Sequence, residues 1–239
     1  MASAVASHRS AAVAEARRIA RRDLVTSFPA SIGAAIPPGI PPETGYPAMT
    51  KTQTLTDIPT LRKRARSNLG EGAVTAGYGA DRNEVLAHLN ASLATELVCV
   101  LRYRRHHFMA RGIHSQSVAA EFLLHSNEEQ GHADQIAERI VQLGGEPDFA
   151  PEGLAGRSHA EYVTGHSLAG MIREDLVAER IAIDSYREII AYLGANDPTT
   201  RRMLEGILAT EEEHADELAD LLVAFPDEAA EKARTAKSK

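Results

Sequence analysis

Two glutamate–histidine pairs with the same internal spacing are the strongest chemical signal in this 239-residue sequence. Glu129 precedes His132 by three residues, and Glu211 precedes His214 by three residues. On a helix, residues three apart lie one above the other on the same face, so each pair can present a carboxylate and an imidazole to one metal ion. A single pair of this kind is usually solvated, and the prediction depends on the repetition.

A lone glutamate precedes each pair at nearly the same distance. Glu96 lies 33 residues before Glu129, and Glu179 lies 32 residues before Glu211. Both lone glutamates interrupt apolar stripes with helical spacing, so their carboxylates face the packed side of a helix. An isolated charge there must be paired or bound to metal. The tyrosines that follow these two glutamates by seven residues are Tyr103 and Tyr186.

Together these residues predict a site for two metal ions, because four glutamates and two histidines would project inward from four helices. Oxygen-rich ligation with one nitrogen per metal favours iron or manganese over structural zinc. We interpret the two tyrosines as candidate catalytic residues, with Tyr103 able to supply an electron, although packing is the alternative role. Likewise, Glu96 could instead form a salt bridge with Arg102 or Arg180.

Other polar residues near these motifs receive lesser roles. Asp175 lies one turn before Glu179 and is a candidate for orienting an imidazole. Several acids beside the pairs are expected to face solvent, namely Glu128, Glu212 and Glu213. Six further histidines fit no ligand spacing, and we interpret them as surface or packing residues. They are His106, His107, His114, His125, His159 and His166.

Four long helices are needed to position these side chains, and the apolar spacing predicts them at residues 82–111, 115–143, 167–193 and 196–225. Asp81 and the Asn196-Asp197-Pro198 sequence are typical of helix starts. The link between the second and third helices, 144–166, is too long for a tight turn. The sequence therefore predicts an all-α four-helix bundle with one long crossover between helices 2 and 3.

Charge divides the chain into a basic arm and an acidic body. Residues 1–80 carry ten Lys/Arg and five Asp/Glu, whereas residues 81–239 carry 16 and 28. We expect residues 1–48 to be a disordered segment or an over-extended reading frame preceding Met49. Residues 49–80 would form a basic arm with a possible short helix at 58–70, residues 81–225 the bundle, and residues 226–239 a flexible tail.

Composition excludes several classes of protein. The single cysteine, Cys99, rules out a disulfide framework, a paired-cysteine redox motif and a four-cysteine zinc site. The sequence has no run of about 18 apolar residues, so we expect no membrane-spanning segment. No secretory signal is recognisable, and we expect a cytoplasmic protein.

Residues 82–225 resemble the ferritin-like superfamily, and specifically its bacterioferritin-type members. The segments that carry the resemblance are Thr95-Glu96-Leu97-Val98, Glu129-Gln130-Gly131-His132-Ala133-Asp134, Asp175-Leu176-Val177-Ala178-Glu179 and Glu211-Glu212-Glu213-His214. The resemblance implies a ferritin-like bundle with two iron ions per subunit. The implied ligands are Glu96 and Glu179 as terminal carboxylates, Glu129 and Glu211 as bridging carboxylates, and His132 and His214 as nitrogen donors.

The activity implied by the resemblance is that of a ferroxidase, in which Fe(II) is oxidised by dioxygen or hydrogen peroxide. Ferric iron would then be stored in a hollow homo-oligomer of 12 or 24 subunits. Haem-carrying bacterioferritins place a methionine directly after the bridging glutamate of the second helix. This chain has Gln130 at that position, so haem is not expected.

Two related functions stay open as alternatives. A Dps-like protector would use peroxide, and its basic arm would hold DNA through Lys51, Arg62, Lys63, Arg64 and Arg66. Dps proteins usually place their metals between subunits, so six ligands within one chain argue against a typical Dps member. For the arm itself, we favour a solvated tail over a DNA-binding segment. A rubrerythrin-like peroxidase commonly adds a rubredoxin module with paired CxxC motifs, which one cysteine excludes, so only a stand-alone bundle of that kind remains open.

Overall fold

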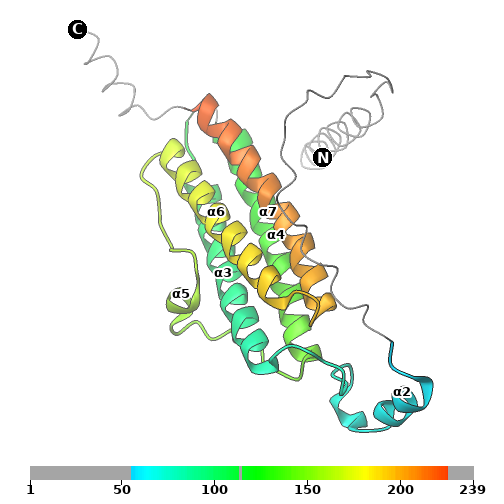
Figure 1. Ribbon diagram of the computed structural model, residues 1–239. Helices are drawn as coiled ribbons and strands as arrows, with labels where there is room; N and C mark the ends of the chain where they lie inside the picture. The colour runs from blue at the N-terminus through cyan, green and yellow to red at the C-terminus, as the bar shows by residue number, and fades with distance from the viewer. Residues whose placement is uncertain (1–54, 113–114, 226–239) are drawn as a thin grey trace, which may run out of the picture. The chain divides into compact units, whose positions relative to one another are not determined.

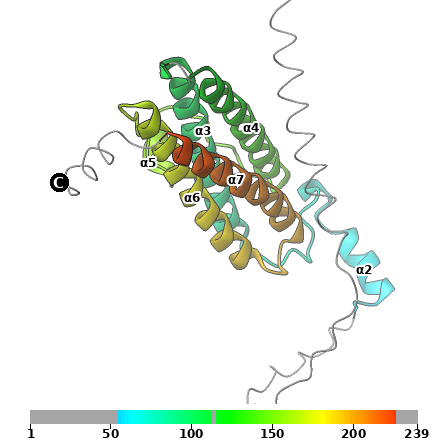
Figure 2. The ribbon, with the colours of Figure 1, turned by 90° about the horizontal axis from the view of Figure 1, so that it is seen from above.

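Four long helices dominate the computed structural model, which describes residues 55–112 and 115–225 (Figure 1). They are α3 (Arg82–Met109), α4 (Ser115–Gln142), α6 (Leu168–Leu193) and α7 (Pro198–Ala224). α3 packs along α4, and α6 packs along α7, as both views show (Figures 1 and 2). The segment joining α4 to α6 contains one short helix, α5 (Leu154–Arg157). The predicted all-α bundle with a long crossover is confirmed.

Predictions for the remaining residues lie outside the described ranges. These are the segment 1–48, the tail 226–239, Lys51 and His114. The described residues before the bundle form α2 (Ile58–Ala65) and a 3₁₀ turn, Leu69–Glu71. α2 ends at Ala65 and is shorter than the predicted 58–70. Asn68, within the predicted range, adopts a left-handed conformation with φ of 53° that a right-handed helix does not contain.

The helix ends follow local sequence chemistry. Asp81 accepts hydrogen bonds from the backbone N–H groups of Asn83 and Glu84 at the start of α3. Asp197 accepts one from Thr200 at the start of α7, where Pro198 occupies the first turn. α3 ends at Met109, two residues before the predicted end, because Ala110 takes an extended conformation and α-helical geometry stops there.

Two apolar clusters fill the bundle. One cluster contains Leu89, Leu93, Ile136, Ile140, Leu193 and Leu204. The other contains Val118, Phe122, Ile172 and Leu218. On each long helix, the predicted metal-site residues lie between the residues that belong to one apolar cluster and the residues that belong to the other. The apolar packing therefore holds a polar layer between two hydrophobic layers.

A buried ionic network fastens α3 to α6 beside this polar layer. The Arg102 Nε–H donates to Asp175 Oδ1 at 2.8 Å, and His106 Nδ1 lies 2.8 Å from Asp175 Oδ2. All three side chains are buried. Breaking such a pair leaves an uncompensated charge in the core, which typically costs about 3–5 kcal/mol.

α3 is also the one helix among the described residues that is long and apolar enough to cross a membrane by length and composition alone. A core helix of a bundle meets the same test. In this fold α3 packs against α4, and its buried side includes Glu96 and Arg102. Its apolar character is therefore explained by packing within the bundle.

Candidate metal centre

The six side chains predicted to bind metal converge inside the bundle. α3 supplies Glu96, α6 supplies Glu179, and α4 and α7 each supply a glutamate–histidine pair. Every one of the six is buried, with exposed fractions from 0% to 6%. Four helices from two halves of the chain therefore bring all the predicted residues together, including pairs more than 100 residues apart in sequence.

The potential ligand atoms form two overlapping groups, in each of which they lie within 4.8 Å of one another. We call the group of Glu96, Glu129, His132 and Glu211 the His132 half-site. We call the group of Glu129, Glu179, Glu211 and His214 the His214 half-site. Two carboxylates, Glu129 and Glu211, belong to both groups. A pair of shared carboxylates between two groups is the arrangement that two adjacent cations require.

Each imidazole directs its Nδ1 atom at the shared carboxylates. His132 Nδ1 lies 2.9 Å from Glu211 Oε1 and 3.3 Å from Glu129 Oε2. His214 Nδ1 lies 3.3 Å from Glu129 Oε1 and 3.4 Å from Glu211 Oε2. Nδ1 is therefore the nitrogen that each histidine would offer to a cation.

Several buried atoms of this cluster have no hydrogen-bond partner among the described residues. They are Glu96 Oε2, Glu129 Oε1, Glu179 Oε2, both carboxylate oxygens of Glu211, and His214 Nδ1. Buried polar atoms are normally satisfied, so inward-facing orphans need an explanation. Carboxylate oxygens with one imidazole nitrogen per position form a donor set that suits iron or manganese.

Burial and mutual repulsion control protonation in this cluster. Burial, followed by the charges of Glu211 and Glu129, raises the pKa of Glu96 well above its usual value. Burial, followed by the charges of Glu129 and Glu211, does the same to the pKa of Glu179. For Glu129, burial also acts to raise the pKa, but the close imidazoles of His132 and His214 outweigh it and lower the pKa.

The imidazoles gain protons from the same surroundings. Burial alone would lower the pKa of His132, but the close carboxylates of Glu129, Glu211 and Glu96 raise it to about 12. The pKa of His214 is also raised, because the close carboxylates of Glu128, Glu129 and Glu211 outweigh burial. Without bound metal, imidazolium charges therefore balance the carboxylates, and cations would have to displace these protons.

The two tyrosines each contact the lone glutamate of the opposite half of the chain. The Tyr103 hydroxyl on α3 donates to Glu179 on α6, and the Tyr186 hydroxyl on α6 donates to Glu96 on α3. Burial, followed by the adjacent carboxylate, raises the pKa of both phenols, which keeps them protonated donors. These hydrogen bonds tie α3 to α6 across the site, a crossing that the seven-residue spacing does not reveal.

Glu128 is more than the solvent-facing acid that the sequence suggested. Its Oε2 accepts a hydrogen bond from His214 Nε2 at 2.8 Å while the side chain stays 42% exposed. A carboxylate on the far nitrogen fixes the tautomer and orientation of a metal-binding imidazole. No sequence pattern marks this role for Glu128, because Glu128 reaches His214 only in the folded bundle.

Two of the histidines that we interpreted as surface or packing residues, His106 and His125, are buried and also have specific polar contacts. His106 contacts Asp175, so Asp175 orients an imidazole, but not one of the predicted ligands. The His125 ring stacks on that of His214, with centroids 4.0 Å apart, and its Nδ1 lies 3.3 Å from the Tyr103 hydroxyl. A sequence signal existed for His125, because it lies one turn before Glu129 on the same helix face.

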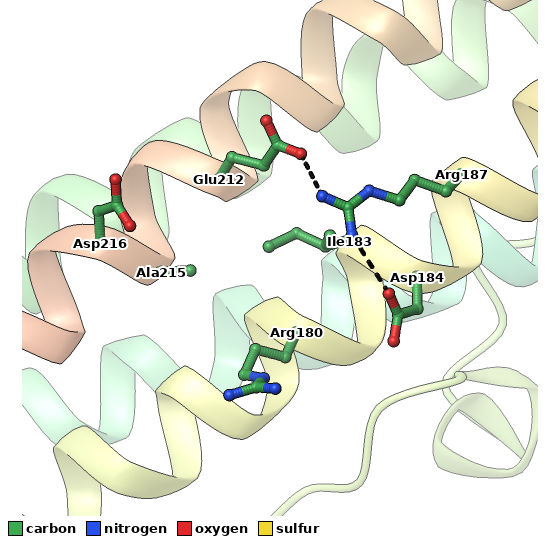
Figure 3. Close-up of a pocket in the computed structure, with 7 residues that line it drawn as sticks. All are labelled: Arg180, Ile183, Asp184, Arg187, Glu212, Ala215 and Asp216. Carbon is green, nitrogen blue, oxygen red and sulfur yellow. Dashed lines mark hydrogen bonds and ion pairs between the residues drawn. The ribbon is translucent and has the colours of Figure 1, made fainter. Parts of the chain in front are cut away.

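The alternative pairing of Glu96 with an arginine is not what the structure contains. Arg102 bonds Asp175 instead. Arg180 lines a groove of about 450 Å³ on the outer side of α6 and α7 (Figure 3). In that groove Arg187 pairs with Asp184 and Glu212, as the dashed lines in Figure 3 mark. None of the six predicted metal-site residues lines it.

Comparison with known proteins agrees with this geometry. The family model described as "Ferritin-like domain" matches residues 86–227, more than half of the chain. The chain belongs to this ferritin-like family. It is 30% identical over 141 residues to a bacterioferritin of Desulfovibrio desulfuricans, covering 58% of this chain and 75% of the relative. It is 34% identical over 137 residues to a nutrient stress-induced DNA-binding protein of Nostoc sp., covering 56% and 74%.

Solved structures place this ferritin-like chain among the same relatives. A dodecameric thioferritin, the bacterioferritin-related protein of Bacteroides fragilis, superposes with a TM-score of 0.58 at 30% identity. The match covers 67% of this chain and 92% of that protein. Dps from Thermosynechococcus elongatus matches with a TM-score of 0.57, covering 59% and 90% of the two chains, and its 21% identity supports the fold alone.

Proposed function

We propose that this protein oxidises Fe(II) at a dinuclear centre within one subunit and stores the ferric product in a hollow homo-oligomer. The observation that most directly supports this proposal is the pair of half-sites that share Glu129 and Glu211. Glu96 and Glu179 would each bind one iron as terminal ligands, and His132 and His214 would each supply one nitrogen. Iron is the substrate and the cargo, with two Fe(II) ions held per subunit.

The proposed reaction takes one electron from each Fe(II). With dioxygen, two electrons and two protons yield hydrogen peroxide and two Fe(III); with peroxide, two electrons and two protons yield two waters. The shared carboxylates hold both ions in one polar layer, and the apolar clusters on either side limit water around it. The Tyr103 and Tyr186 hydroxyls hold the terminal carboxylates through hydrogen bonds. The two Fe(II) ions supply both electrons, so Tyr103, the candidate electron donor, is not needed for this step.

A cage-like assembly is part of the proposal. Large apolar side chains on the long helices stay exposed in the single chain, including Leu101, Phe108, Leu124 and Val177. Exposed apolar surface on helices that already have a filled core is suited to contacts between subunits. The dodecameric state named for the Bacteroides fragilis relative makes twelve subunits the first size to test, with 24 as the alternative.

Haem is not part of the proposed protein. Gln130 donates through Nε2 to Asp134 Oδ1 at 3.0 Å, and an amide at this position offers no sulfur ligand. The purified protein should lack the intense visible absorption of haem. A haem band that persists after the substitution Gln130→Ala would show that another residue binds haem.

Aerobic titration with Fe(II), followed by size-exclusion chromatography and iron counting, tests the function. We expect a cage-sized peak that retains hundreds of irons per oligomer, and we expect Glu129→Ala to abolish oxidation and retention. Glu138→Ala, which removes an exposed acid from the same helix, is the matched control. A small oligomer that keeps about two irons per chain and consumes peroxide would indicate a rubrerythrin-like peroxidase instead.

A Dps-like role in DNA protection is a second candidate, favoured by the composition of α2. Its last turn contains Arg62, Lys63 and Arg64, and no residue of α2 is buried. The Nostoc relative is named as a DNA-binding protein. Salt-dependent retardation of duplex DNA, lost when these three residues are replaced by glutamine, would support this role. Equal retardation by the variant would contradict it.

A further inference from the structure

A second polar cluster lies beside the dinuclear centre on the solvent side. It consists of Glu121 and His125 on α4 and Glu217 on α7, and their potential ligand atoms lie within 4.8 Å of one another. His125 Nε2 is 3.1 Å from Glu217 Oε2 and 3.8 Å from Glu121 Oε1. The imidazole is fully buried, whereas both carboxylate side chains are 31% exposed. The cluster therefore combines a held nitrogen with two carboxylates that solutes can reach.

One His125 nitrogen contacts the Tyr103 hydroxyl, and the other faces the two carboxylates. The single Tyr103 hydroxyl proton is donated to Glu179, so the tyrosine oxygen is left to accept from His125 Nδ1–H. The other ring nitrogen, Nε2, faces Glu217 and Glu121. An imidazole nitrogen and two carboxylates that converge on one point are a donor set suited to a divalent cation.

Glu217 is negatively charged at neutral pH. Hydrogen bonding with His125, acting against burial, lowers the pKa of Glu217. Two carboxylates and one imidazole with further positions open to water form a common donor set for divalent transition metals. The exposure of both carboxylates also gives an ion direct access from solvent.

The internal repeat of the chain does not account for these three residues. The glutamate–histidine pairs recur at an offset of 82 residues, from Glu129 to Glu211 and from His132 to His214. The same offset places apolar or neutral residues where the second cluster has its ligands. Met203 corresponds to Glu121, Ile207 to His125, and Gln135 to Glu217.

We propose that Glu121, His125 and Glu217 form a third divalent-metal site, distinct from the dinuclear centre and present on one side of the bundle only. His125 also belongs to a compact group with Glu179 and His214, so an ion at the third site is separated from the dinuclear centre by one imidazole ring. On the proposed function, this site is a staging position for Fe(II) moving from solvent toward the His214 half-site.

Metal counting with Co(II) tests the site separately from any oxidation chemistry. Metal-free full-length protein is dialysed against Co(II), and bound metal is counted for the wild type, for Glu121→Gln with Glu217→Gln, and for Glu129→Gln with Glu211→Gln. The control is Glu138→Gln with Glu213→Gln, which removes two exposed acids from the same helices. Circular dichroism verifies that each variant is folded, and the single Glu217→Gln variant is measured alongside.

If the third site exists, the variant with both Glu121→Gln and Glu217→Gln binds one Co(II) per chain fewer than the control. Glu217→Gln alone lowers the affinity for that same ion. Equal counts in the double variant and its control would overturn the proposal. Loss of three ions at once would overturn it as well, because the site would not be separate. Failure of the dinuclear proposal would appear elsewhere, as an unchanged count in the Glu129→Gln, Glu211→Gln variant.

The staging role has its own readout. At Fe(II) concentrations below saturation, Glu121→Gln with Glu217→Gln should slow iron oxidation several-fold relative to the control, and the two rates should converge as Fe(II) saturates. Such a pattern changes the apparent affinity for Fe(II) and leaves the chemical step intact. Equal rates at low Fe(II) would overturn the staging role.

Discussion

The two half-sites contain matching ligands but lie in different surroundings. In the His214 half-site, Glu128 bonds the imidazole Nε2 and His125 stacks on the ring. At an offset of 82 residues, the positions that would serve His132 in the same way are Thr210 and Ile207. The repeat therefore conserves the type of inward ligand within the chain, whereas the residues behind those ligands differ. We expect two adjacent cation positions with unequal affinity.

The largest expected effect comes from removing a carboxylate that both half-sites share. Glu129→Ala should eliminate both bound cations and reduce Fe(II) oxidation by at least about 100-fold, because even residues behind the ligands contribute about 10–100-fold. Glu96→Ala removes a carboxylate of the His132 half-site only and should leave one cation. Anaerobic metal counting distinguishes these outcomes. Equal losses in the two variants would contradict the distinction between shared and terminal carboxylates.

Proton competition should affect both half-sites and is the next largest effect. The pKa of metal-free His132 is raised to about 12, and those of His214, Glu96 and Glu179 are also raised, so these groups keep their protons to higher pH than the free side chains do. Metal binding must release such protons, and affinity should therefore rise with pH between 5 and 8, by about tenfold per pH unit for each proton released. Calorimetry in buffers of different ionisation enthalpy measures the number released. A metal affinity that does not change with pH would contradict this protonation state.

Replacing Glu128 sharpens the comparison between the half-sites. Glu128→Gln should lower the affinity for one of the two cations by about tenfold, because the His214 imidazole loses its carboxylate partner. Thr210→Val alters the corresponding position in the other half and should leave both affinities unchanged. Competitive titration with a chelating dye measures the two affinities. A similar change at both cation positions in Glu128→Gln would show that the carboxylate acts on the whole cluster.

The smallest expected difference lies between the tyrosines. Tyr103→Phe removes the hydrogen bond to Glu179 and the contact with His125, whereas Tyr186→Phe removes only the hydrogen bond to Glu96 among the contacts described. Loss of one net hydrogen bond, about 1 kcal/mol, corresponds to about a fivefold effect on oxidation rate. Stopped-flow measurements should show Tyr103→Phe to be slower than Tyr186→Phe. The reverse order would argue against a special role of Tyr103.

Helical periodicity and the repeated glutamate–histidine spacing were sufficient to predict the bundle and to choose the six residues that converge in it. Both signals are local, since they depend on which side of one helix a residue occupies. The helix ends were less predictable, as the early stop of α3 at Ala110 shows. A backbone that turns extended at an alanine has no strong sequence marker.

The residues behind the ligands depend on contacts between helices and could not be assigned from spacing alone. Tyr103 reaches Glu179 on α6, and Glu128 reaches His214 on α7, although both lie far away in sequence. His125 differs, because its position one turn before Glu129 placed it on the ligand-bearing face of α4. That periodicity was present in the sequence, but our interpretation of His125 as a surface or packing residue did not use it.

The central claim is that one chain holds two iron ions between shared carboxylates. Diffraction from crystals soaked anaerobically with Fe(II), recorded on both sides of the iron absorption edge, tests it most directly. Two anomalous peaks should lie within each chain, both adjacent to Glu129 and Glu211, with the peak beside His214 the stronger at limiting iron. A single peak, or peaks whose ligands come from two subunits, would contradict the claim.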